Sequence, residues 1–172
     1  SLARTRMSMS TAALVFASCS DSAKAQSLLD ELTKTYPKDT PVAIGAVLTK
    51  AQLERSKGNL TQAIQLLDSV KSYDMGMIMG NVTNYLRGEL YLQQHLGNEA
   101  AAEFQKIIDH RGVDAQSLIH PLSHVGLARA AVMRGDTATA RKGYQDFFAL
   151  WKDADPDLPV LVQAKKEYEQ IK

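Results

Sequence analysis

The segment YLRGELYLQQHLGNEAAAEFQKII, residues 85–108, decides the fold. Apolar residues recur at intervals of three and four on both sides of its LGN break, and β-branched residues are few, which is the pattern of two helices joined by a turn. Gly88 lies twelve positions before Ala100, and the bulky Phe104 follows Ala100 by four. Because two helices approach closely only where their side chains are small, we expect Gly88 and Ala100 to lie at the contact between the helices of a hairpin.

The same combination of small and bulky residues recurs along the chain. Each second helix carries an alanine followed four positions later by a bulky residue, and each first helix carries a small residue twelve positions before that alanine. Successive alanines of the second helices are 37 to 40 residues apart. A repeat of this length with two helices per unit is typical of a helical solenoid. The residues are Ala13, Ala25 and Leu29; Ala51, Ala63 and Leu67; Gly88, Ala100 and Phe104; and Ala128, Ala140 and Tyr144.

Helix-breaking residues divide the sequence into eight helices and a ninth at the end, and no long stretch alternates with the period of two that strands require. Alternate breaks are short, as between the two helices of a hairpin. We therefore expect an all-α fold, an α-α superhelix (solenoid) of about four helical hairpins closed by a C-terminal capping helix. The expected hairpins cover residues 3–37, 41–72, 81–110 and 117–151, the capping helix covers 158–171, and residues 1–172 form a single domain.

These hairpins resemble tetratricopeptide repeats. In residues 85–108, Gly88, Tyr91, Ala100 and Phe104 stand in the signature places, whereas His95 stands where the family usually has a glycine before the turn. The next hairpin is similar, and the first one is the most divergent. The resemblance implies a TPR-like superhelix whose role is to bind other proteins.

The order of these segments also resembles the C-terminal sensor half of large bacterial regulators. In such regulators the repeats follow a serine/threonine kinase domain or a winged-helix DNA-binding domain. The G-x-G-x-x-G, H-R-D and D-F-G motifs of a kinase are absent from the sequence. The resemblance therefore implies a non-catalytic interaction or sensor module in signal transduction, and the opening SLARTR, which lacks an initiating Met, suggests a piece of a longer protein.

Composition narrows the classes of partner. The 172 residues include 20 Lys and Arg and 19 Asp and Glu, a formal net charge of +1, so the chain lacks the excess of positive charge with which proteins follow nucleic-acid phosphates. No stretch approaches the 18 or more apolar residues of a membrane span. Cys19 is the only cysteine, which excludes an internal disulfide. We expect a protein or peptide ligand, or self-association, with no nucleic acid and no membrane insertion.

The N-terminal segment has two interpretations. Arg4 and Arg6 precede MSMSTAALVFASCS, which has the order of a lipoprotein leader ending at Cys19 and would make the protein periplasmic. The apolar stretch is short, however, and serines interrupt it. Helical spacing favours an amphipathic helix and a cytoplasmic protein. The residues with that spacing are Leu2, Met9, Ala13 and Phe16.

The expected binding surface follows from the curvature of a solenoid. Stacked hairpins form a concave face lined by their first helices, on which such repeats hold an extended peptide. A mixture of Arg, Tyr and amide side chains suits peptide carboxylates and backbone groups. The alternatives are an ordinary solvated face, and a structural oligomerisation scaffold, free-standing or attached to a winged-helix regulator, in which edge helices pair between chains. The expected peptide-binding residues are Gln52, Arg55, Tyr85, Glu89, Gln93 and Arg129.

Two motifs have the spacing of metal ligands, but the residues around them favour structural roles for both. A calcium loop beginning at Asp153 needs Gly and Glu where Leu158 and Ala164 stand, so we expect Asp157 to cap the last helix instead, with Pro159 in its first turn. His120 and His124 have the spacing of two zinc ligands on a helix, but Pro121 places a helix start between them. We expect no metal, no cofactor and no catalytic residue, and a metal protein that uses these histidines and His110 is a third hypothesis.

The last helix is expected to cover the end of the core. Its apolar face should pack over Trp151 and Phe147, and its charged face should meet water. Methionines between the second and third hairpins, at Met75, Met77 and Met79, are interpreted as filling a loose connection. In the last helix we expect Leu161, Ala164 and Tyr168 to face inward, and Lys165, Lys166, Glu167 and Lys172 to face water.

Overall fold

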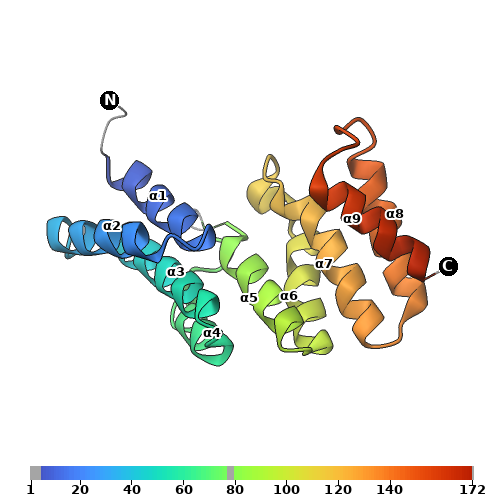
Figure 1. Ribbon diagram of the computed structural model, residues 1–172, viewed down its shortest axis with the longest axis horizontal. Coiled ribbons are helices and arrows are strands. Elements are labelled where there is room, and N and C mark those ends of the chain that lie inside the picture. The colour runs from blue at the N-terminus through green and yellow to red at the C-terminus, as the bar shows by residue number, and fades with distance from the viewer. Residues whose placement is uncertain (1–4, 77–79, 172) are drawn as a thin grey trace. The chain divides into compact units, whose positions relative to one another are not determined.

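The structure is a computed structural model that describes residues 5–76 and 80–171. Over these residues the chain forms nine α-helices, two short 3-10 helices and no strand, which confirms the all-helical prediction and its count of helices. Figure 1 shows the helices in chain order. They are α1 (Arg6–Ser18), α2 (Ser22–Thr35), α3 (Thr40–Ser56), α4 (Leu60–Asp68), η1 (Lys71–Tyr73), α5 (Val82–Gln93), α6 (Gly97–Asp109), η2 (Arg111–Asp114), α7 (Ile119–Met133), α8 (Thr137–Leu150) and α9 (Pro159–Gln170).

The helices gather into two compact units. The N-terminal unit is Ser1–Tyr73 and the C-terminal unit is Asp74–Lys172. In the N-terminal unit α1 packs against α2 and α3, and α3 packs against α4. In the C-terminal unit each helix from α5 to α9 packs against the next, and α5 also contacts α7. Helices adjacent in sequence are therefore neighbours in space within each unit.

The predicted small and bulky residues form the contacts between helices. All twelve of them are buried, and the four alanines of the second helices are 0% exposed. Gly88 shows why size matters, because a Cβ atom placed there would lie 2.7 Å from Cζ of Phe104. The same ring would be 2.5 Å from a Cβ atom on Gly126 of α7. Phe104 thus packs against two glycines, one on α5 and one on α7.

The four hairpins share one turn geometry. The residue five positions before each buried alanine has a positive φ: 62° at Ser20, 82° at Gly58, 58° at His95 and 71° at Gly135. In each turn the next amide donates a hydrogen bond of 2.9 Å to the carbonyl five residues before it. This bond and the left-handed residue are the marks of a Schellman ending, which turns the chain sharply at the end of a helix.

Helix N-termini differ in how well they are capped. Asp21 and Asp136 follow the left-handed residue in their turns, and each accepts a hydrogen bond from the amide three residues later. Leu96 holds the same place before α6, and its side chain accepts no such bond. The prediction that Asp157 caps the last helix is wrong. The N-cap of α9 is Leu158, without a side-chain bond, because the helix starts at Pro159, which is in the first turn as expected.

The prediction of a helix at the N-terminus is confirmed over the described part of the segment. Met9 and Ala13 of α1 are buried in a cluster with Leu32 and Val42, and Phe16 packs near Ala17. Leu2 lies outside the described residues, as do Met77 and Met79 of the methionine-rich connection. Met75, within the described part, is half-buried.

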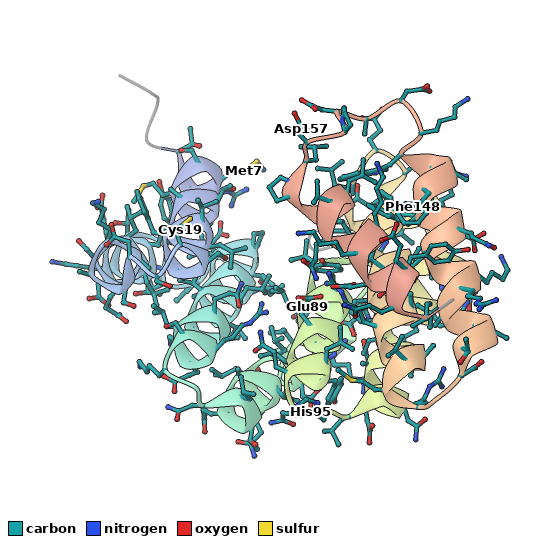
Figure 2. The ribbon with its side chains drawn as sticks, turned by 45° about the vertical axis from the view of Figure 1, so that its right-hand side comes forward. Met7, Cys19, Glu89, His95, Phe148 and Asp157 are labelled. Carbon is teal, nitrogen blue, oxygen red and sulfur yellow. The ribbon has the colours of Figure 1, made fainter. Side chains whose placement is uncertain are left out.

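The end of the chain covers an aromatic core. Phe147 is 0% exposed and packs against Trp151 with ring centroids 4.9 Å apart, while Phe148 and Tyr168 pack edge to face. Figure 2 labels Phe148 beside α9. Leu161 and Ala164 of α9 are buried against this cluster, as predicted.

Candidate functional site

The sequence-predicted binding residues divide between the two units. Gln52 and Arg55 lie on α3 of the N-terminal unit. Gln52 is buried, and its Nε2 atom donates a hydrogen bond of 3.0 Å to Oγ of Ser18, so it joins α3 to α1. Tyr85 lies on α5 and packs its ring edge to face against Phe104, with centroids 5.8 Å apart.

The other three predicted residues line one cavity, which we call the C-terminal cavity. It has a volume of about 370 Å³ and lies between residues of α5, α7, α8 and the end of α9. Glu89, labelled in Figure 2, and Gln93 come from α5, and Arg129 comes from α7. The remaining residues that line it are Leu92, Val132, Met133, Tyr144, Glu167, Gln170 and Ile171.

A carboxylate from the last helix organises this cavity. Glu167 accepts hydrogen bonds from Nε and Nη2 of Arg129, at 2.9 and 3.1 Å, and from the hydroxyl of Tyr144 at 2.8 Å. The expectation that Glu167 faces water is therefore wrong. Because α9 packs against α8, Glu167 comes within reach of Tyr144 on α8 and of Arg129 on α7.

The charges of this cluster are fixed by its hydrogen bonds. Burial acts to raise the pKa of Glu167, but its bonds with Arg129, Gln163 and Tyr144 outweigh burial and lower the pKa. Burial acts to lower the pKa of Arg129, and the bonds to Glu167 outweigh that effect and raise it. Burial and the Glu167 carboxylate raise the pKa of Tyr144 well above its usual range. At neutral pH the cluster is an anion and a cation with a neutral hydroxyl donor.

The lining of the C-terminal cavity suits the binding of a ligand more than catalysis. The charged residues of the lining are two carboxylates, Glu89 and Glu167, and one guanidinium, Arg129. Leu92, Val132, Met133 and Ile171 supply apolar wall. A protonated Tyr144 donates a hydrogen bond and does not act as a base.

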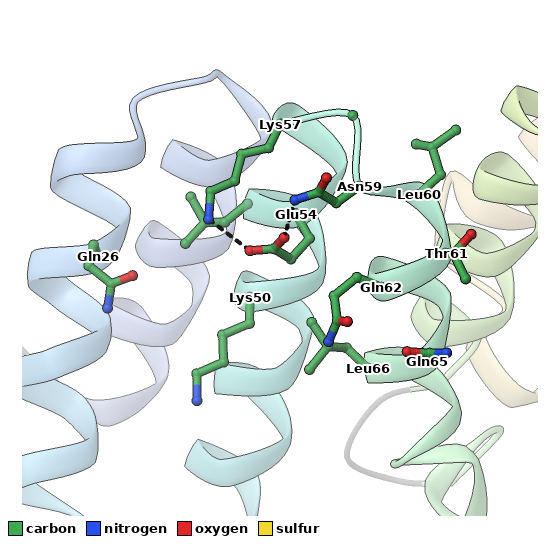
Figure 3. Close-up of a pocket in the computed structure, with 12 residues that line it drawn as sticks. Gln26, Lys50, Glu54, Lys57, Asn59, Leu60, Thr61, Gln62, Gln65 and Leu66 are labelled. Atoms are coloured by element: carbon green, nitrogen blue, oxygen red, sulfur yellow. Dashed lines mark hydrogen bonds and ion pairs between the residues drawn. The ribbon is translucent and has the colours of Figure 1, made fainter.

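A larger cavity of about 710 Å³ lies in the N-terminal unit, lined by α2, α3 and α4 (Figure 3). Glu54 accepts hydrogen bonds from Lys57 Nζ at 2.7 Å and Asn59 Nδ2 at 2.8 Å. These bonds lower the pKa of Glu54. None of the predicted binding residues lines this cavity; the polar residues around it include Gln26, Lys50, Gln62 and Gln65.

A buried charge cluster holds the start of the C-terminal unit together. Arg87 on α5 is 0% exposed and pairs with Asp74, which precedes the helix, and with Glu103 on α6 at 3.2 Å. Asn84 donates a hydrogen bond of 2.9 Å to Glu103. Burial acts to raise the pKa of Glu103, but its bond to Lys106 and the charge of Arg87 outweigh burial and lower it. No sequence signal marked this cluster, because its charges are 13 and 16 residues apart.

The predicted histidine motif forms a ring pair. His120 and His124 are each 8% exposed and meet edge to face with centroids 5.2 Å apart, and α7 starts at Ile119, one residue before His120. Nδ1 of His124 lies 3.6 Å from Oδ2 of Asp146. His110 follows the last residue of α6, and its Nδ1 atom lies 2.8 Å from the carbonyl of Lys106 in that helix. Across residues 5–76 and 80–171, no group of three His, Cys, Asp or Glu residues is placed to hold a metal.

Comparisons with models of known protein families, with curated proteins and with solved structures each found no match. In the described part of the chain, no helix combines the length and apolar character needed to cross a membrane.

Proposed function

We propose that this chain is a non-catalytic protein-interaction domain, a TPR-like superhelix of four hairpins and a capping helix that binds a peptide segment of a partner. The observation that carries the proposal is the C-terminal cavity. Helix spacing predicts Glu89, Gln93 and Arg129 as ligand-binding residues, and they line one cavity of peptide side-chain size. The shared turn geometry supports the repeat architecture, because the same left-handed position and hydrogen bond recur in all four hairpins.

We also propose that the domain is part of a larger regulatory protein. The resemblance of the chain to the sensor half of bacterial regulators, which is strongest over residues 85–168, supports a cytoplasmic regulatory serine/threonine kinase as the parent protein. In that setting, occupation of the cavity alters the activity of the attached domain by stabilising one of its states.

Site-specific photocrosslinking tests the binding role. A photoreactive amino acid replaces Gln93, which is exposed and lines the C-terminal cavity. The matched control replaces Gln105, which is exposed on α6 and does not line the C-terminal cavity. We expect a partner from the native lysate to crosslink at position 93 and not at position 105. Equal crosslinking at both positions, or none at position 93, would contradict the proposal.

Self-association is a second candidate, favoured by an exposed apolar patch. Leu96, Val132 and Met133 are 38%, 44% and 42% exposed, and a Cβ atom on Gly97, the residue after Leu96, would lie 3.2 Å from Cβ of Met133. If this patch pairs two chains, the mass measured by sedimentation rises with concentration, and the Met133→Glu variant stays monomeric. A monomeric wild-type chain at every concentration would exclude this candidate.

A further inference from the structure

We propose that the cavity of about 710 Å³ in the N-terminal unit, which we call the N-terminal cavity, is a second binding site. It takes an extended peptide segment of a partner that carries an Asp or Glu side chain. Lys50 binds the carboxylate of that side chain, and Gln62 and Gln65 bind the peptide backbone. The inference goes beyond the proposed function, because it concerns the other unit of the chain and residues that were not expected to bind a ligand.

Three packed helices form the N-terminal cavity. Helix α3 packs against both α2 and α4, and Figure 3 shows Lys50 of α3 between Gln26 of α2 and Gln62 of α4. Leu53 of α3 lines the cavity and is 5% exposed, because it belongs to a buried cluster of the N-terminal unit. The cavity is therefore built by helix packing and has a volume within the range of ligand cavities.

The charges of the lining favour an anionic ligand. The charged residues that line the cavity are Lys50, Lys57 and Glu54, and Glu54 is already bound by Lys57 and Asn59. Over the described ranges 5–76 and 80–171, no ion pair or side-chain hydrogen bond is found for Lys50, and no dashed line reaches it in Figure 3. A ligand carboxylate would give this ammonium group a partner, whereas a basic ligand would meet it as a like charge.

The amide side chains of α4 favour an extended backbone. Gln62 and Gln65 are exposed, line the cavity and are three residues apart, so they lie on one face of the helix. A glutamine amide has donor hydrogens and an acceptor oxygen, which match the C=O and N–H groups of a peptide. For both residues, no side-chain hydrogen bond is found within the part of the chain that the structure describes.

The α2 side of the cavity is less available to a ligand. The Nε2 atom of Gln26 donates a hydrogen bond of 2.8 Å to Oδ1 of Asp30 in its own helix. The ammonium group of Lys50 on α3 and the two amides on α4 are then the groups that can bind. A peptide that uses all three lies along the side of the cavity where α3 meets α4.

The test is a selection of random twelve-residue displayed peptides on the whole chain. Selected and unselected pools are sequenced, and the frequency of Asp and Glu is compared. The most enriched peptide is made with a fluorescent label, its affinity is measured by anisotropy, and its site is mapped by amide chemical shifts of the labelled chain. The variants are Lys50→Gln, the double variant Gln62→Ala and Gln65→Ala, and the control Lys34→Gln, which removes an exposed lysine on α2 that does not line the cavity.

We expect acidic peptides to be enriched and to shift the amide signals of α3 and α4. Lys50→Gln should lose affinity roughly fivefold, the size expected for an ion pair at the surface, and the double glutamine variant should lose a similar factor. Lys34→Gln should bind like the wild type.

Three results would overturn the inference. They are a selection that enriches basic peptides or yields no binder, acidic peptides that bind Lys50→Gln as tightly as the wild type, and shifts confined to the C-terminal unit. None of them would remove the proposed function, because crosslinking at Gln93 tests that function separately.

Discussion

The ring of Phe104 occupies the space that a Cβ atom on Gly126 would need, with ring carbons 2.5 Å from that position. Phe104 is 0% exposed and also packs against Gly88, so its ring has no room to retreat. A methyl group at residue 126 therefore forces α7 away from α6.

We expect Gly126→Ala to lower the free energy of unfolding by about 1–3 kcal/mol, the usual cost of overpacking a core. Urea denaturation monitored by circular dichroism measures it. The control is Gly112→Ala, where a Cβ atom would have no neighbour within 4 Å, and which should change stability little. A Gly126→Ala variant as stable as wild type would show that α6 and α7 separate freely.

His95, labelled in Figure 2, occupies a left-handed position that glycine adopts without strain. We expect His95→Gly to raise the free energy of unfolding by about 0.5–1 kcal/mol, because the side chain is exposed and the backbone strain is relieved. The reverse change, Gly135→Ala, should cost about 1 kcal/mol. No atom lies within 4 Å of a Cβ there, so the cost would be backbone strain alone. Equal stability of the wild type, His95→Gly and Gly135→Ala would contradict the prediction that side chains at these positions strain the backbone.

Leu96 holds the N-cap position of α6 with a backbone like that of Asp136, φ −91° and ψ 73° against −86° and 79°. We expect Leu96→Asp to raise the melting temperature, because an aspartate there accepts a hydrogen bond from a free amide of the first turn, worth about 1 kcal/mol. Thermal denaturation of Asp136→Ala is the matched control, and it should show a loss of similar size. A lower melting temperature for Leu96→Asp would mean that its apolar contacts outweigh the cap.

Removal of Arg87 should be the most damaging single change to the C-terminal unit. Arg87→Met leaves the largely buried Asp74 without its cation and Glu103 with Lys106 as its remaining cation, which costs about 3–5 kcal/mol. Arg6→Met is the comparison, because Arg6 also pairs with an aspartate, Asp39, but is 52% exposed. An exposed pair contributes about 1 kcal/mol or less. Similar losses in the two variants, measured by urea denaturation, would contradict this view of the buried cluster.

The histidine pair should make stability depend on pH in the weakly acidic range. Burial and the nearby charge of Arg111 lower the pKa of His120, and burial, His120 and Lys142 together outweigh Asp146 and lower that of His124. The unfolded chain, in which histidine titrates near about 6.5, therefore takes up protons first as the pH falls. The contribution of the two neutral histidines to the free energy of unfolding is complete above about pH 7. It is lost as the pH falls through about 6.5 toward the lower pKa values that the histidines have in the folded chain.

Urea denaturation at pH 7.5 and pH 5.5 measures this dependence. The free energy of unfolding should be lower at pH 5.5 in the wild type, and the difference should shrink in the double variant His120→Gln and His124→Gln. At still lower pH a further loss is expected from Glu103 and Glu167, whose lowered pKa values stabilise the fold only while both are ionised. An unchanged pH dependence in the double variant would exclude the histidines as its source.

Residues whose role depends on size and spacing were predictable from sequence. Ala100 and Phe104 are buried at the hairpin contact because a small residue and a bulky one, spaced by a helical turn, can pack in few other ways. Helix spacing places Glu89, Gln93 and Arg129 on one face of successive first helices, and the three residues line one cavity; their role in binding stays a prediction. The left-handed residue of a turn cannot always be found by looking for a glycine, because His95 adopts this backbone conformation without being one.

Residues whose role depends on tertiary partners were not predictable. Glu167 is on the polar side of α9 when that helix is considered alone, and it meets Arg129 only because of how α9 packs. Gln52 projects to an open face of α3 by helical spacing, yet α1 covers it and Ser18 accepts its hydrogen bond. The sequence does not distinguish the buried Arg87 from an exposed arginine, because its partners Asp74 and Glu103 approach it only in the folded chain.

The common turn of the four hairpins also matters for protein engineering. The turns at Ser20, Gly58, His95 and Gly135 have the same backbone geometry, with a left-handed residue followed by an amide that bonds to the carbonyl five residues earlier. The loop of any one hairpin should therefore fit in place of the other three. A tag or recognition loop tolerated at one turn should be transferable to the rest without altering the length of the helices it joins.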